Sequence, residues 1–149
     1  MAISADVNFI FIPKATLILD QITFACIIAT PKYIFIVPKE GISGQGRTIN
    51  TTKYTINSTD PITGIQEYIQ NKDLNIKDLE DFLNKILFED LNLQKDQFFI
   101  EIAKHPELMI KASFFSKGIY YKKTGAKGYA GIAISGKDNA IKLKNFYGK

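Results

Sequence analysis

Histidine and cysteine, two residue types that often act as bases, nucleophiles and metal ligands, each occur once in this 149-residue chain. His105 precedes Pro106 at an expected connector, and the sequence spacing places no nucleophile or orienting acid beside it. Cys26 lies in the apolar run 24–29, where we expect a buried, inert thiol, because a reactive thiolate needs access and nearby positive charge. One His and one Cys are too few ligands for a zinc site. We therefore expect a protein that is not an enzyme and uses no metal or cofactor.

Acidic side chains are dense between residues 73 and 90, which raises the question of a divalent cation site. Asp78 and Asp81 stand three residues apart in a segment with helical periodicity, on the side opposite its apolar residues. Their spacing does not match an EF-hand loop. These acids are therefore expected to form a solvated helix face.

A glycine-rich segment after Pro38 contains the only arginine of the chain. Residues 43–48 read SGQGRT and can form a backbone nest for an anion, with Arg47 as a bidentate clamp. The segment is not a Walker A motif, because it lacks the Lys-Ser/Thr ending and no helix start follows directly. A flexible linker is the alternative to an ordered anion site.

The C-terminal region combines lysines, aromatic residues and turn signals. Residues 108–149 hold nine Lys against a single acid, Asp138, a formal charge of +8, whereas residues 61–107 carry −5. Tyrosine stacking and lysine contacts to phosphate are how sheet surfaces hold single-stranded nucleic acid. No RNP-type motif is present, and a twisted ribbon whose aromatics are core or cross-strand pairs is the alternative. The candidate anion-binding residues are Arg47, Lys122, Lys123, Lys127, Tyr121 and Tyr129.

Four short runs in this region, rich in β-branched and aromatic residues, predict a meander of consecutive hairpins. They span residues 108–115, 119–123, 129–135 and 140–146, with Gly or Asn in each connection. In the last run apolar residues at 141 and 143 alternate with Lys142 and Lys144, the period of two that is typical of a strand. The apolar face of this meander needs a cover, which helices elsewhere in the chain can supply.

The first third of the chain predicts further strands. Residues 7–12 and 15–20 are interpreted as two short strands, the first ended by Pro13. Residues 24–29 and 33–37 are nearly continuous Ile, Val, Phe and Tyr on either side of Pro31. Because Pro31 presets φ for a turn, this segment is expected to form a β-hairpin that is buried on both faces.

A helical block is predicted between residues 61 and 104. Asp60 and Pro61 form a helix start, and Asn75 can cap a second helix. The second helix carries an apolar stripe at helical spacing: Ile76, Leu79, Leu83, Ile86 and Leu87. Residues 94–103 suit either a helix or a strand, and we favour the helix because Asp96 can cap it and Pro106 would stop it.

These elements predict a single α+β domain over residues 1–149. We expect an antiparallel sheet or incomplete barrel built from N- and C-terminal strands, with a central block of two to three helices on one face. In strand order, the hairpin around Pro31 and the later basic meander resemble the bacterial pleckstrin-homology-like or GRAM-type barrels. That resemblance implies a barrel with a helical insertion and a role in docking lipids or proteins. The terminal strand expected here departs from the closing helix of that class, and no functional residue carries over.

Composition qualifies these interpretations. Lysine outnumbers arginine eighteen to one and isoleucine outnumbers leucine twenty-four to ten, so A/T-rich coding accounts for part of the lysine excess. A single cysteine and an N-terminus without a basic n-region predict a cytoplasmic protein, and no apolar run reaches the ~18 residues of a membrane span.

The charge distribution leads to two functional hypotheses. The first is a non-enzymatic binding module whose basic C-terminal ribbon contacts an anionic partner, namely nucleic acid, anionic lipid or an acidic protein surface. The alternative is a structural or self-associating protein, a homo-oligomer formed through strand edges or through its opposed charges.

Overall fold

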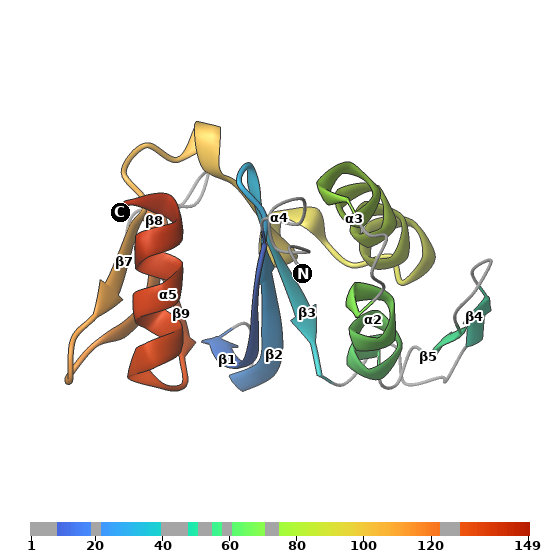
Figure 1. The fold of residues 1–149 in the computed structure, drawn as a ribbon, viewed down its shortest axis with the longest axis horizontal. Helices are drawn as coiled ribbons and strands as arrows, with labels where there is room; N and C mark the ends of the chain where they lie inside the picture. Colours follow the sequence, from blue (N-terminus) through green and yellow to red (C-terminus); the bar gives the residue numbers. More distant parts are fainter. Residues whose placement is uncertain are drawn as a thin grey trace.

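The computed structural model describes residues 9–18, 22–39, 48–50, 55–57, 61–70, 75–122 and 129–149. Within these residues seven strands form one antiparallel sheet in the order β6-β3-β2-β1-β9-β8-β7, which makes an open, incomplete barrel (Figure 1). The strands are β1 (Ile10–Ile18), β2 (Ile22–Ala29), β3 (Tyr33–Pro38), β6 (Phe99–Glu101), β7 (Met109–Ala112), β8 (Lys117–Lys122) and β9 (Tyr129–Ile134). A separate two-stranded sheet consists of β4 (Thr48–Asn50) and β5 (Thr55–Asn57). The predicted α+β architecture is confirmed.

Strand β1 joins the N-terminal and C-terminal strands, because it pairs with β2 on one side and β9 on the other. Its register with β2 shifts between Ile12 and Ala15. Pro13, which has no N–H to give to a ladder, lies in this irregularity. The prediction of two separate short strands here is therefore wrong, since one interrupted strand spans residues 10–18.

The β2–β3 hairpin around Pro31 is confirmed. The Thr30 N–H donates to the Tyr33 carbonyl oxygen over 2.8 Å and closes the turn. Residues 25–30 and 34–38 are all buried, so this pair of strands is covered on both faces. Figure 1 shows α2 (Pro61–Ile69) and α3 (Ile76–Asn84) on one side of β1–β3 and α5 (Lys137–Tyr147) on the other.

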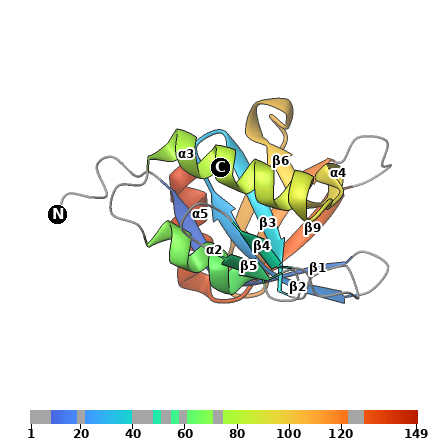
Figure 2. The same cartoon turned by 90° about the vertical axis from the view of Figure 1, so that its right-hand side faces the viewer.

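The central helical block begins as predicted at Pro61 and after Asn75. The Asn75 side-chain oxygen accepts from the Asp78 N–H at 2.8 Å, which caps α3. A π-helical turn, η1 (Lys85–Asp90), continues α3, and the stripe residues Leu79, Leu83, Ile86 and Leu87 are fully buried. Figure 2 shows α2 and α3 in front of the strands that they cover.

The prediction of one helix over residues 94–103 is wrong. Only α4 (Lys95–Phe98) is helical there; β6 (Phe99–Glu101) follows it and pairs with β3, and the 3-10 turn η2 (Ile102–Lys104) ends the segment. In β6 the Ile100 side chain enters the core and the Phe99 ring packs against Tyr33 and Phe35. Pairing with a distant strand therefore outweighs the local capping signal.

The prediction of a fourth ribbon strand over residues 140–146 is also wrong, because this segment lies in helix α5. Ala140 and Leu143 are buried, and Tyr147 packs on the same side at helical spacing, while Ile141 and Lys142 face outward. Gly148, with a left-handed φ of 70°, ends the helix. Helix α5 therefore stands where the sequence predicted a terminal strand.

The other three runs of the ribbon form β7, β8 and β9 in consecutive antiparallel pairs, as predicted. Gly118 allows β8 and β9 to approach closely, because a Cβ at this position would lie 2.4 Å from the Ile132 carbonyl oxygen. Helix α5 packs on the inner face of these strands and supplies the cover that the apolar alternation requires.

Candidate binding surface

Strands β7–β9 expose one face of the sheet. Ile110, Ile119 and Ile132 point to the core under α5 and are almost fully buried. The alternate residues Lys111 and Lys122 are exposed on the opposite, outer face. Because α2 and α3 cover the β1–β3 part of the sheet, the outer face of β7–β9 is the part that they leave open (Figure 1).

Tyr120 is fixed at the centre of this outer face. Its ring lies over Gly131, where an added Cβ would be 3.1 Å from a ring carbon. The Lys111 Nζ lies 4.8 Å from the ring centroid, within cation–π range, and the Tyr120 hydroxyl is 3.2 Å from the Ser116 Oγ. These contacts hold an aromatic ring and a cation together on an open surface.

The residues chosen from sequence fall in different places. Lys122 is exposed at the end of β8, whereas Tyr121 is only 4% exposed and its ring meets His105 edge-on at 5.3 Å. Tyr121 therefore lies in the core and not on the outer face. Tyr129 pairs through its backbone with Lys122. The remaining three, Arg47, Lys123 and Lys127, lie outside the described residues.

Lys111 and Tyr120, which share the outer face, are not among the candidate residues predicted from the sequence, whereas the buried Tyr121 is. The alternation of side chains in a strand predicts this arrangement for β8, because Tyr120 and Lys122 lie on one face and Tyr121 lies on the other. The β7–β8 register then brings Lys111 next to Gly118 and Met109 next to Tyr120. That register could not be fixed from the sequence alone.

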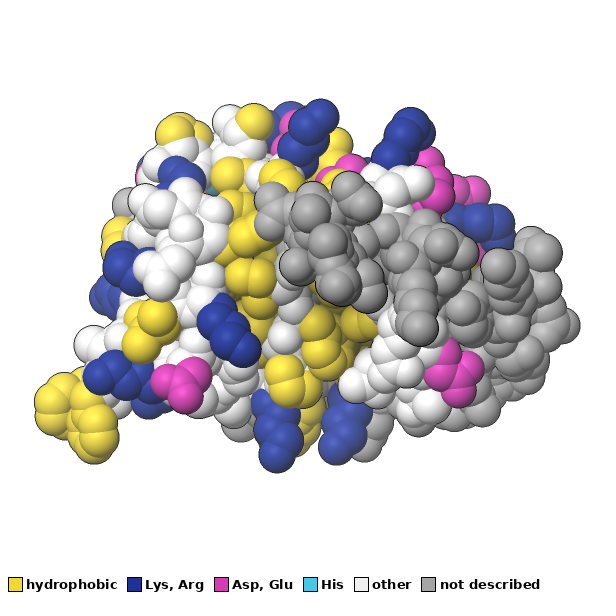
Figure 3. Space-filling model, viewed as in Figure 1, with side chains coloured by type: hydrophobic (Ala, Val, Ile, Leu, Met, Phe, Trp, Pro, Cys, Tyr) yellow, Lys and Arg dark blue, Asp and Glu magenta, His cyan; other side chains and the backbone are white. Residues whose placement is uncertain are grey.

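The lysines of the C-terminal segment do not all share this face. Lys142 and Lys144 lie on α5, and the Lys144 Nζ donates to the Ile110 carbonyl oxygen over 3.2 Å. The Lys149 Nζ donates to the Pro106 carbonyl oxygen over 3.3 Å. Figure 3 accordingly shows cationic side chains spread among neutral ones over the half of the molecule that contains α5. The outer face therefore holds a subset of the cations.

His105 borders a shallow, open depression of about 280 Å³, lined by Lys95, Asp96, Phe99, Glu101, Lys104 and His105. The His105 Nδ1 lies 3.6 Å from the Glu107 Oε2, and neither buried atom has a hydrogen-bond partner among the described residues. Burial, assisted by the Asp96 charge, raises the pKa of the neighbouring Tyr121 phenol, which keeps it protonated near neutral pH. The depression therefore gathers charges beside a phenol that is not activated for nucleophilic attack.

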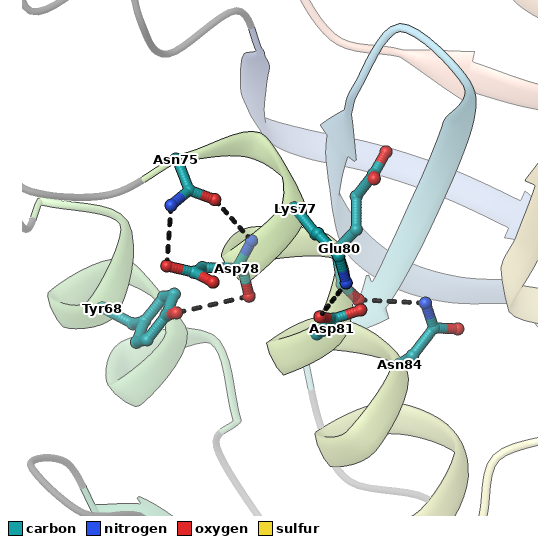
Figure 4. A network of polar contacts seen from close by, with 7 residues as sticks. All are labelled: Tyr68, Asn75, Lys77, Asp78, Glu80, Asp81 and Asn84. Atoms are coloured by element: carbon teal, nitrogen blue, oxygen red, sulfur yellow. Dashed lines mark hydrogen bonds and ion pairs between the residues drawn. The ribbon is translucent and has the colours of Figure 1, made fainter.

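The acidic side chains of α3 are engaged with protein groups (Figure 4). Asp78 accepts from the Asn75 side-chain amide at 2.8 Å, and Asp81 pairs with Lys77 at 3.1 Å on the exposed helix surface. The Thr30 hydroxyl donates to the Glu80 carboxylate over 2.7 Å, which ties α3 to the β2–β3 turn. No group of three or more His, Cys, Asp or Glu within the described ranges is placed to hold a metal ion.

Comparison of the chain with protein-family models, with curated proteins and with solved structures gives no match. Among the helices that the structure describes, none is long and apolar enough to cross a membrane.

Proposed function

We propose that the protein is a non-enzymatic binding module that contacts an anionic macromolecule with the outer face of β7–β9. The observation that carries this proposal is the half-buried Tyr120 ring between the exposed Lys111 and Lys122 of one sheet face, with the Lys111 ammonium 4.8 Å from the ring centroid. The cluster lies in a segment with a formal charge of +8. An aromatic ring among cations, on a sheet face that none of the described helices covers, suits phosphate or carboxylate groups.

Lysine in place of arginine determines what kind of recognition to expect. A lysine ammonium is a compact point charge without the forked geometry that reads individual bases or phosphates. Contacts of this type depend on charge density and release counterions, so affinity falls steeply as the salt concentration rises. The expected partner is therefore a polyanionic surface that is recognised with little sequence specificity.

The test is a salt series with two probes, an oligothymidylate and vesicles of phosphatidylcholine with phosphatidylserine. We expect binding at about 50 mM salt that weakens steeply as salt is added. The double variant Lys111→Glu/Lys122→Glu should bind about tenfold more weakly or worse, since each lysine near an anionic surface contributes about 1 kcal/mol. Absence of binding to both probes at low salt would contradict the proposal.

A matched control separates the outer face from total charge. Lys77→Glu/Lys142→Glu changes the net charge by the same amount at two exposed helix positions that do not lie on the outer face of β7–β9. We expect this variant to bind both probes with an affinity close to that of the unmodified protein. Equal losses in the two double variants would show that total charge, and not the outer face, determines binding.

Self-association is the second candidate function. Residues 61–107 carry −5 and residues 108–149 carry +8, so the two segments of different copies can attract each other. Strand β7 lies at the edge of the sheet, but its Ile110 N–H already donates to the Lys149 carbonyl oxygen at 3.4 Å. Charge attraction is thus the better route to an oligomer, and light scattering should show a mass that falls as salt is added. A strict monomer at high concentration would contradict it.

A further inference from the structure

The connection between β7 and β8 presents two adjacent phenylalanines to solvent. Phe114 is 75% exposed and Phe115 is 93% exposed, and their rings contact each other with centroids 5.1 Å apart. The hairpin projects from the end of the sheet (Figure 1), and an apolar knob protrudes at the same place in Figure 3. Exposed apolar side chains that are contiguous, and not scattered singly, mark an interaction site.

The hairpin tip is held in a defined conformation. The Ser113 N–H donates to the Ser116 carbonyl oxygen at 2.9 Å, and the Ser116 N–H donates to the Ser113 Oγ at 3.1 Å. The Lys117 Nζ donates to the Phe114 carbonyl oxygen at 3.2 Å. Because the turn is already closed by these bonds, little ordering of the tip is needed when its rings are buried by a partner.

Lysines lie at the same end of the sheet as the two rings. Lys117 follows the tip directly, and the pairing of β8 with β9 brings the start of β8 alongside the end of β9. There the Ser135 N–H donates to the Lys14 carbonyl oxygen at 3.1 Å, and Lys137 begins α5 two residues later. Asp138 is the single acid of residues 108–149 and adjoins Lys137. The apolar tip is therefore flanked mainly by positive charge.

We propose that the Phe114–Phe115 tip inserts into an anionic lipid bilayer, with Lys14, Lys117 and Lys137 at the level of the headgroups. This inference rests on the proposed function and names its partner. A convex apolar tip on a rigid hairpin suits a deformable surface better than it suits stacking of bases in a groove. Burial of two aromatic rings and attraction of a few cations to anionic headgroups are each weak, and together they suit reversible binding to an anionic membrane.

The first experiment reports on the environment of the tip. The chain contains no tryptophan, so Phe115→Trp introduces the only one. Its emission should shift to shorter wavelength, and quenchers attached to the acyl chains should reduce it, when vesicles with phosphatidylserine are added. Tyr68→Trp, a reporter on α2 away from the tip, should not respond. An unchanged Phe115→Trp emission on vesicles that bind the protein would overturn the inference.

The second experiment separates this inference from the proposed function. Phe114→Ser/Phe115→Ser should bind anionic vesicles about tenfold more weakly or worse, because the variant loses the favourable free energy of moving two aromatic rings from water into the bilayer. Its thermal midpoint should be unchanged. Its affinity for oligothymidylate should be unchanged, and Phe114→Leu/Phe115→Leu should restore vesicle binding. Vesicle binding that is equal in the Ser and Phe forms, or binding to oligothymidylate alone, overturns membrane insertion and leaves the proposed function standing. Absence of binding to either probe overturns both.

Discussion

The Tyr147 hydroxyl joins helix α5 to the β2–β3 turn. Its oxygen lies 2.6 Å from the Thr30 carbonyl oxygen and 3.0 Å from that of Tyr33, so the phenol of α5 satisfies the β2–β3 turn. The Thr30 hydroxyl in turn donates to Glu80 of α3. A buried acceptor that loses its donor lowers the free energy of unfolding. Because the bonds form one network, this loss weakens the attachment of both α3 and α5.

Replacement of this hydroxyl should therefore destabilise the protein. We expect Tyr147→Phe to lower the free energy of unfolding by about 1–3 kcal/mol, because the Thr30 carbonyl loses the phenol donor in a part-buried site, whereas the Tyr33 carbonyl keeps the Thr30 N–H. Urea denaturation measures this difference. Tyr68→Phe, which removes a more exposed hydroxyl bonded to the Asp78 carbonyl oxygen at 3.3 Å, is the control and should change stability by less. A midpoint equal to that of the unmodified protein would contradict the role given to Tyr147.

The same phenol predicts how stability depends on pH. Burial, together with the nearby Glu80 charge, raises the pKa of Tyr147 above its ordinary value near 10. The folded state thus favours the protonated phenol, and its stabilising contribution is present below pH ~10 and is lost as pH rises further. Between pH 10 and 11 the unmodified protein should lose stability more steeply than Tyr147→Phe, in urea titrations at each pH. Tyr121, whose pKa is also raised, contributes to the dependence of stability on pH in both proteins. Identical slopes in the two proteins would contradict the role given to the Tyr147 phenol.

Cys26 should be unreactive in the folded protein. The residue is fully buried in β2, and burial raises the pKa of its thiol to about 12. Since only the thiolate reacts, a disulfide reagent near pH 8 should label the thiol at the rate at which the protein unfolds. Added urea should then accelerate labelling in parallel with unfolding. Labelling in native buffer as fast as that of a free thiol would show that the site is open.

Helices are predicted best from the sequence where their start and periodicity signals are local. The Asn75 cap and the stripe of α3 are both visible in the sequence, and both are present in the structure. Helix α5 has no such start signal, because Gly136 precedes it with a φ of 95° and no side-chain cap. Its apolar residues at 141 and 143 alternate with lysines at the period of two that is typical of a strand. Strand β6 has three residues and depends on its pairing with β3, which local propensity cannot show.

The buried apolar stripe of α3 should contribute strongly to stability. Leu83 is fully buried between the helices and the sheet, and truncation leaves a cavity that the close-packed surroundings only partly fill. We expect Leu83→Ala to cost about 2–5 kcal/mol in the free energy of unfolding. Lys77→Ala, at an exposed position of the same helix, should change it by less than about 0.5 kcal/mol. Equal urea midpoints for the two variants would exclude the stripe from the core.

For the whole molecule, the sequence predicted the architecture better than the surface. Alternation and turn residues indicate which runs become strands, but the strand order that places β9 beside β1 comes from long-range packing. That order, together with α5, decides which lysines share a face. Lys111 and Lys122 are placed on the outer face, whereas Lys142, only a few residues along the chain from the same ribbon, lies on a helix that covers the inner one.

Lysine acetylation, read by mass spectrometry with and without phosphatidylserine vesicles at low salt, tests the binding surface most directly. We expect vesicles to protect Lys111 and Lys122, on the outer face, and Lys117, beside the tip, from acetylation. Lys77 and Lys142, which are exposed on helices α3 and α5, should react at the same rate with and without vesicles. Protection of Lys77 and Lys142 to the same extent as Lys111 and Lys122 would contradict the assignment of β7–β9 as the binding face.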